Sequence, residues 1–221
     1  MANPAAGGEL ASGFGIDMQP QVANGKVYIA TAALLGGGIA YALDARTGRT
    51  LWSFDTATDP IANQIIAGGV WNTPAIGSDG TIYFGVGNMY QPARVALRSP
   101  GPRLYTDSTV GLNPATGRLK WYFQAVRNDF HDWDMQLSPI IAQRNGREVV
   151  IDSGKMGYVY AMDAASGHLL WKTRVGVHNG HDNDGELALA HKLAMPPAFG
   201  GRLSPAQINA VAKYVSSVAG R

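Results

Sequence analysis

Two stretches of the sequence concentrate side chains that can move protons or carry charge. The stretch NDFHDWDMQLSP, residues 128–139, holds four such side chains within six residues, namely Asp129, His131, Asp132 and Asp134. Carboxylates and imidazoles commonly act as general acids and bases, although the same composition is typical of a solvated loop. The stretch DSGKMGYVYAMD, residues 152–163, adds one cation, Lys155, just before a glycine turn. It is either a surface lysine or a fixed positive charge for a negative partner.

A third stretch carries residue types that suit a metal ion. The segment VGVHNGHDND contains two histidines and two aspartates, His178, His181, Asp182 and Asp184. His-x-x-His is a usable spacing for zinc. Glycine and asparagine recur through the same segment, however, so a turn-rich loop without a metal is the alternative.

A threefold repeat supplies the elements that must position these side chains. The hairpins YALDARTGRTLW, VGLNPATGRLKW and YAMDAASGHLLW cover residues 41–52, 110–121 and 160–171. In each, an Asp or Asn can bond the backbone two residues on, and the glycine accepts the positive φ of a bulged hairpin loop. The polar residues of these turns therefore serve geometry, and the closing tryptophans, Trp52, Trp121 and Trp171, are predicted to pack between repeats.

Each repeat is longer than its hairpin. It begins with a proline and apolar residues, continues through a polar turn and a strand, and ends with the hairpin, which gives four candidate strands per unit. The sequence therefore predicts an all-β fold, a partial β-propeller of about three four-stranded antiparallel blades, plus a C-terminal α-helix. A solenoid or a sandwich is the alternative.

The predicted organisation has four parts. Residues 1–16 are a leader or the remnant of a preceding blade, residues 17–175 are the three blades, and residues 176–203 are a linking loop. Residues 204–221 are predicted to be a helix with Ser204 as N-cap, Pro205 at its first position and Gln207 completing a capping box. Apolar residues recur on one face of that helix.

Composition excludes several classes of function. The 18 basic and 16 acidic residues are spread along the chain, so no basic stripe indicates a nucleic-acid partner. The chain has no cysteine, which excludes disulfides, thiolate metal sites and a c-type haem attached through Cys-x-x-Cys-His. No run of 18 apolar residues predicts a membrane span, and the first residues do not have the pattern of a signal peptide.

The three hairpins resemble the pyrroloquinoline quinone (PQQ) repeat, whose blade signature ends in Asp-x-x-Thr-Gly-x-x-x-Trp. The similarity to the quinoprotein alcohol dehydrogenase family extends over roughly residues 15–185. It implies PQQ as cofactor, a small-molecule alcohol as substrate and an electron acceptor as partner. It also implies a periplasmic or extracellular location.

The resemblance assigns the candidate site residues. The segment GGVWNTPAIGSDGTIYFGVGN, residues 68–88, is similar to the family segment that provides a tryptophan beneath the quinone and an asparagine ligand to calcium. This makes Trp71 the cofactor-binding floor and Asn88 the metal ligand. An indole face suits a flat cofactor, and an amide oxygen suits calcium. A core tryptophan and an asparagine that caps a strand end are the structural alternatives.

The two charged stretches match the rest of the family's site. Aligning Asp129 with the first aspartate of the family segment His-Asp-x-Trp-Asp-Tyr places Asp132 at the catalytic position, as general base and as a metal ligand with Asn88, and Asp134 is the rival if the register slips by two. Lys155 matches the basic residue that contacts the quinone oxygens. A cation there would stabilise developing negative charge.

The chain departs from the family in two ways. The glutamate ligand of the family's calcium is missing, because Ala33 or Leu34 stands at its place, and this argues against a calcium site. Propellers close with about four to eight blades, so a three-bladed chain predicts a fragment with possible edge-to-edge self-association. A non-catalytic propeller scaffold for protein interaction is the alternative function.

The last residues, AMPPAFGGRLSPAQINAVAKYVSSVAGR, resemble the end of a cytochrome c domain. Met195 matches the axial sulfur ligand of that family. The haem attachment motif is missing, so no haem is expected.

Overall fold

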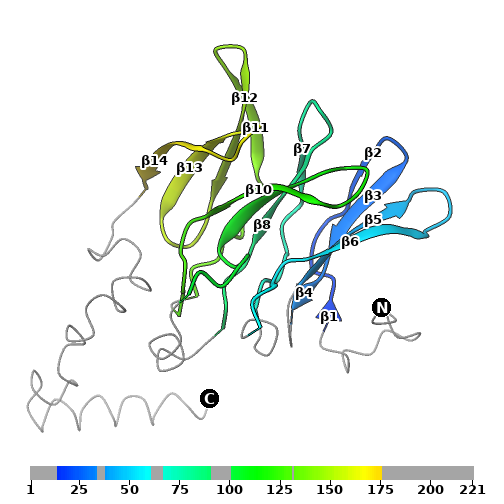
Figure 1. Ribbon diagram of the computed structural model, residues 1–221, viewed down its shortest axis with the longest axis horizontal. Helices are drawn as coiled ribbons and strands as arrows, with labels where there is room; N and C mark the ends of the chain where they lie inside the picture. Colours follow the sequence, from blue (N-terminus) through cyan, green and yellow to red (C-terminus); the bar gives the residue numbers. More distant parts are fainter. Residues whose placement is uncertain (1–13, 34–37, 61–66, 91–100, 131, 176–221) are drawn as a thin grey trace, which may run out of the picture.

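The computed structural model describes residues 14–33, 38–60, 67–90, 101–130 and 132–175. This part of the chain is all-β, and its main strands form three four-stranded antiparallel sheets, each a simple meander. The three sheets stand side by side in chain order, as blades of a fan (Figure 1). The predicted all-β fold with three four-stranded blades is confirmed. The predicted C-terminal helix lies outside the described residues.

Blade 1 consists of β2 (Gln21–Ala23), β3 (Lys26–Ala30), β5 (Ile39–Asp44) and β6 (Thr50–Asp55). A separate two-stranded sheet pairs β1 (Phe14–Gly15) with β4 (Ala32–Ala33). Blade 2 consists of β7 (Ala75–Ile76), β8 (Ile82–Val86), β9 (Ser108–Leu112) and β10 (Leu119–Gln124). Blade 3 consists of β11 (Ile140–Arg144), β12 (Arg147–Ser153), β13 (Tyr158–Asp163) and β14 (Leu169–Arg174).

Blade 2 is covered on both faces, because it lies between the other two. Every residue of its central strands β8 and β9 is buried. One hydrophobic cluster joins Tyr28 and Trp52 of blade 1 to Phe84 of blade 2, and a second joins Trp121 of blade 2 to Met162 of blade 3. Burial of these apolar side chains is the main force that holds the blades together.

The tryptophans of the repeat join one blade to the next. The indole N–H of Trp52 donates to the carbonyl of Pro114, 3.1 Å away, in the hairpin turn of blade 2. The indole N–H of Trp121 donates to the carbonyl of Ala164, 2.8 Å away, in the turn of blade 3. Both indoles are only 7% exposed. The packing role predicted for Trp52 and Trp121 is therefore confirmed.

Within the part of the chain that the structure describes, no helix has the length and apolar character needed to cross a lipid bilayer.

Candidate functional site

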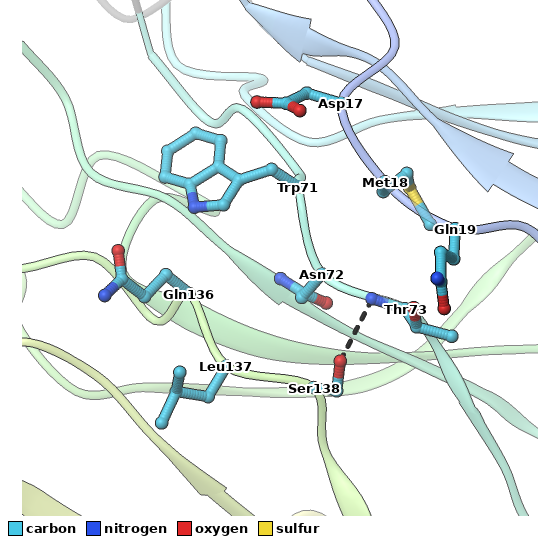
Figure 2. A pocket seen from close by; sticks show the side chains of 9 residues that line it. All are labelled: Asp17, Met18, Gln19, Trp71, Asn72, Thr73, Gln136, Leu137 and Ser138. Atoms are coloured by element: carbon cyan, nitrogen blue, oxygen red, sulfur yellow. Dashed lines mark hydrogen bonds between the residues drawn. The ribbon is translucent and has the colours of Figure 1, made fainter.

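A hollow of about 430 Å³ opens where the first strands of the three blades begin. Its lining comes from the segments that lead into β2, β7 and β11: Asp17, Met18, Gln19, Trp71, Asn72, Thr73, Gln136, Leu137 and Ser138 (Figure 2). The backbone N–H of Thr73 donates to Ser138 Oγ across the hollow, at 3.1 Å. All three blades therefore contribute to one concave surface, which is the usual setting for a small-molecule site.

Backbone contacts to the end of β8 fix the position of Trp71. The side-chain amide of Asn72 bonds both backbone groups of Gly85, donating to its carbonyl at 2.6 Å and accepting from its N–H at 3.1 Å. The N–H of Gly87 donates to the carbonyl of Gly69 at 2.8 Å. Trp71 is thus held beside Gly87, and its half-buried indole lines the hollow.

Gly87 is the point where the predicted site residues meet. A Cβ at this glycine would lie 2.5 Å from the ring atom Cη2 of Trp71 and 2.8 Å from Oδ1 of Asp134. Only a residue without a side chain fits such a close approach. The missing Cβ therefore lets an indole and a carboxylate from two different loops converge on one spot.

The loop that carries the aspartates is tightly bent. Asp132 and Asp134 both have positive φ, at 65° and 28°, a conformation that non-glycine residues rarely adopt. Asp129 Oδ2 stabilises the bend by accepting the N–H of Trp133 at 2.8 Å. A Cβ at Gly154 would lie only 2.0 Å from the carbonyl oxygen of Asp134, so this glycine lets the loop pack against blade 3.

Asp134 is the best-connected carboxylate of the site. Its Oδ1 accepts the backbone N–H of Asn88 at 2.6 Å, and its Oδ2 accepts Lys155 Nζ at 2.6 Å. Its side chain is completely buried. Burial raises the pKa of Asp134, while the hydrogen bonds from Lys155 and Asn88 act in the opposite direction. The site therefore contains a buried carboxylate beside a cation.

Lys155 links this buried carboxylate to an exposed one. Its Nζ also donates to Asp132 Oδ2 at 2.9 Å, and the Asp132 side chain is 53% exposed. Burial acts to lower the pKa of Lys155, but the hydrogen bonds to Asp134 and Asp132 outweigh it, so the pKa is raised and the ammonium stays charged. The structure therefore brings Trp71, Asn88, Lys155 and both candidate aspartates together.

Three further polar residues near the site were not identified from the sequence. Asp107 is fully buried, and burial together with the charges of Asp129 and Asp134 raises its pKa well above the usual range. Asp152 accepts Thr109 Oγ1 at 2.6 Å, and burial raises its pKa to about 7. Burial and the nearby charge of Asp134 raise the pKa of Tyr90 to about 12. An acid inside the otherwise uncharged segment TDSTVGL was the available signal for Asp107.

The residues present fit PQQ better than they fit calcium. Trp71 offers a flat indole face beside the hollow, and Lys155 offers a cation bound to Asp134, whose other oxygen approaches Gly87 as the indole does. Asn88 Oδ1 is buried and has no hydrogen-bond partner among the residues that the structure describes, so it is free to act as a ligand atom. Within the described residues, however, no three acidic or histidine side chains are grouped to hold a metal ion. The residue at the family's glutamate position is Ala33, which ends β4, or Leu34, which lies outside the described residues.

The segment with His178, His181, Asp182 and Asp184, for which zinc and a metal-free loop were the alternatives, lies outside the described residues, as do His131 and Met195.

Family models and known proteins place this chain in a wider group. A model described as the glucose/ethanol/alcohol dehydrogenase β-propeller domain matches residues 64–188, more than half of the chain. A second model, described as outer membrane protein assembly factor BamB, matches residues 6–88. The two matches share residues 64–88, a range that includes Trp71 and Asn88.

Among curated proteins, lupanine 17-hydroxylase [cytochrome c] of a Pseudomonas species is 32% identical over 182 residues, covering 68% of this chain and 26% of that protein. Quinohemoprotein alcohol dehydrogenase ADH IIB of Pseudomonas putida is 29% identical over 193 residues, covering 74% of this chain and 28% of that protein. The chain thus spans about a quarter of the length of these relatives.

Solved structures agree with the sequence matches. Quinohemoprotein alcohol dehydrogenase ADHIIG of Pseudomonas putida superimposes with a TM-score of 0.68 at 27% identity, covering 77% of this chain and 30% of the other. The quinohemoprotein alcohol dehydrogenase of Comamonas testosteroni superimposes with a TM-score of 0.65 at 27% identity, covering 78% and 31%. The blades described above therefore match part of the fold of larger proteins.

Proposed function

The chain belongs to the β-propeller family of glucose, ethanol and alcohol dehydrogenases, and we propose that it carries part of a PQQ-dependent site for the oxidation of an alcohol. The observation that carries the proposal is the convergence of Trp71 and the Asp134–Lys155 pair on Gly87, beside a hollow lined by all three blades. The family resemblance supports a location in the periplasm or outside the cell.

The described residues divide the work of such a site. Trp71 would hold the flat cofactor against its indole face, and Lys155 would contact the quinone oxygens. Bound PQQ would supply the hydride acceptor. Asn88, whose Oδ1 has no hydrogen-bond partner among the described residues, would offer that oxygen to the cofactor or to a cation beside it. The assignment of Asn88 and Asp132 to calcium stays a prediction, and no step here depends on calcium.

Asp134 is our candidate for the general base. It is buried, its pKa is raised by burial, and Lys155 keeps a positive charge within 2.6 Å of it. Both oxygens of Asp134 already accept one hydrogen bond, so a remaining lone pair would take the hydroxyl proton of an alcohol, while the ammonium of Lys155 would stabilise the negative charge that remains nearby. Asp132 is the other candidate, and its exposure gives it contact with solvent.

Two matched variants distinguish these candidates. The chain is mixed with PQQ, with and without calcium, and alcohol oxidation is measured with an artificial electron-accepting dye. If Asp134 is the base, Asp134→Asn lowers the rate by about 100-fold or more, whereas Asp132→Asn lowers it much less. The reverse order would assign the base to Asp132. PQQ binding without oxidation in the unaltered chain would contradict the catalytic proposal.

A scaffold for protein interaction is the second candidate function. The match of residues 6–88 to the outer membrane protein assembly factor model favours it. A chain that binds no PQQ but retains its fold would support this alternative.

A further inference from the structure

The hollow is separate from the charged pair of the candidate site. Neither Asp134 nor Lys155 lines it. Trp71 belongs to both, because its ring lines the hollow while its atom Cη2 lies beside Gly87, which Asp134 also approaches. The volume of the hollow, about 430 Å³, is that of a small-molecule site. It can therefore hold a part of a ligand that the charged pair does not contact.

The segment before β2 forms one wall of the hollow and is anchored on both sides. β1, which pairs with β4, ends at Gly15. Met18 Sδ accepts the backbone N–H of Ala30 at 3.1 Å, and its side chain packs against the hydrophobic core. Asp17 lies between these two anchors and is exposed at the hollow. In Figure 2 its carboxyl group is directed toward the indole of Trp71.

The loop before β11 forms another wall. A Cβ at Gly85 would lie 2.5 Å from the carbonyl oxygen of Met135 and 3.2 Å from that of Leu137, so the backbone of this loop rests directly on β8. Gln136 follows Met135 and turns its amide to the hollow. An amide oxygen accepts hydrogen bonds from a charged donor as readily as from a neutral one. Both walls thus present oxygen atoms to an occupant.

The lining of the hollow has one charged side chain, and its charge is negative. Asp17 is the charged residue among the nine, and the other eight carry amide, hydroxyl or apolar groups or the indole. The ion pairs between described residues do not include Asp17. A cation in the hollow would therefore meet a complementary charge, whereas an anion would meet a carboxylate of the same sign.

Trp71 adds a second attraction for a cation. An ammonium group within about 6 Å of an aromatic ring is attracted by its face, and the indole is the strongest partner of this kind. The indole of Trp71 is half-buried, and the hydrogen bonds of its neighbour Asn72 to Gly85 hold it in place. The carboxylate of Asp17 and this indole line the same hollow, so one cation can contact both.

We propose that the hollow binds an organic ammonium group, with Asp17 as its carboxylate partner and Trp71 as its aromatic partner. The inference rests on the proposed function in one respect, namely that the ammonium group belongs to the alcohol that is oxidised. The hydroxyl of that alcohol lies toward Asp134, and its ammonium end occupies the hollow. The substrate class is an amino alcohol.

The test compares three benzyl alcohols that differ in the charge of one substituent. The para-aminomethyl derivative is a cation at neutral pH, the para-methyl derivative is neutral and the para-carboxyl derivative is an anion. Tryptophan fluorescence follows their binding to the folded chain at low salt, without PQQ. The cation is expected to bind about tenfold more tightly than the anion, with the neutral alcohol between them. High salt should reduce this preference, because it screens exposed charges.

A charge-removing variant and a matched control locate the preference. Asp17→Asn keeps the size of the side chain, and the preference for the cation is expected to fall by about threefold. Asp55→Asn is the control, since Asp55 is an exposed acid at the end of β6 that does not line the hollow, and this variant should keep the full preference. Equal affinities for the three alcohols, no binding of the cation, or a preference unchanged by Asp17→Asn would overturn the proposal.

Oxidation assays separate this inference from the proposed function. With PQQ and the electron-accepting dye present, kcat/KM is measured for the same three alcohols. Oxidation of all three without a preference for the cation would overturn the inference and leave the proposed function standing. Tighter binding of the cation without oxidation of any of the three would support the ammonium site and contradict the proposed function.

Discussion

The hairpin turns and the site loop both contain aspartates, but the pKa values of these carboxyls are shifted in opposite directions. In the turns, Asp44 and Asp163 accept hydrogen bonds from the hydroxyl and backbone of their own hairpin, which lowers the pKa of each carboxyl. In the site loop, burial raises the pKa of Asp134. Three turns repeat one solution along the chain, whereas the loop from Asp129 to Ser138 occurs once.

The difference distinguishes polar residues that stabilise the fold from polar residues whose shifted pKa values suit a functional site. A turn aspartate is solvated, and its local hydrogen bonds are complete. The site aspartate reaches across two blades, to Asn88 of blade 2 and Lys155 of blade 3, and depends on both. Perturbed carboxyls in a concave site are typical of functional sites. Variants of the site loop and of the hairpin turns test this difference.

The largest effect is expected from Lys155→Met. This change leaves the buried carboxylate of Asp134 without its cation, which costs about 4 kcal/mol of unfolding free energy at neutral pH. Lys120→Met is the matched control, because Lys120 and Asp79 form an exposed pair at 2.8 Å worth less than about 1 kcal/mol. Urea denaturation measures both. Equal losses of unfolding free energy in the two variants would show that the Asp134–Lys155 pair contributes no more than an exposed pair.

A smaller effect is expected in the turns from Gly117→Ala. Gly117 and Gly48 both have φ of 71° or close to it, so alanine costs about 1 kcal/mol at either position through backbone strain. At Gly117 the new Cβ also presses on Trp52, which adds about 2 kcal/mol. Denaturation at dilute protein concentration compares the two. If Gly48→Ala costs as much as Gly117→Ala, the indole contact contributes nothing.

The next effect concerns the pH dependence of stability. Asp152 has a folded pKa of about 7, above its unfolded value, so its contribution is fully present below pH 4 and is lost as pH rises through 7. Asp152→Asn should therefore gain about 2 kcal/mol over the unaltered chain at pH 8 and nothing at pH 4. Unfolding at both pH values checks this. A constant difference between the two proteins would show that Asp152 does not titrate in this range.

The smallest effect is expected from Asp163→Ala. Its lowered pKa means that its contribution is present above pH 4 and is lost as pH falls. Because the carboxyl is exposed, the loss at neutral pH should be less than about 1 kcal/mol. The melting temperature should differ from that of the unaltered chain at pH 7 and agree with it at pH 2. A difference that persists in acid would assign the effect to packing of the turn.

The repeat made most of the fold predictable. Strand alternation, the Asx-x-x-Thr/Ser-Gly turns and the closing tryptophans are local signals, and three copies of them predicted three four-stranded blades. The same copies predicted that Trp52 and Trp121 pack between blades, since a large side chain at a fixed position needs a fixed partner. The same prediction was wrong for Trp171, which is 37% exposed because no described blade lies against the outer face of blade 3.

The site was less predictable, because it depends on the path of one irregular loop. The resemblance named Trp71, Asn88, Lys155 and Asp132, but it left the register open between Asp132 and Asp134. Both residues have positive φ, which the residue types of the loop do not predict. This backbone conformation turns Asp134 inward and leaves Asp132 about half exposed to solvent. Gly87 and Gly154 were overlooked for the same reason. Each matters because it has no side chain, which lets other residues approach its backbone closely.

The central claim is that Trp71 and the Asp134–Lys155 pair form a floor and a charged wall for PQQ. The most direct test titrates PQQ into the chain and follows tryptophan fluorescence, with Trp71→Phe compared with Trp171→Phe, whose indole is exposed on the outer strand of blade 3. Saturable quenching that persists in Trp171→Phe and disappears in Trp71→Phe is the predicted result. Quenching that is unchanged by Trp71→Phe, or no binding by the folded chain, would contradict it.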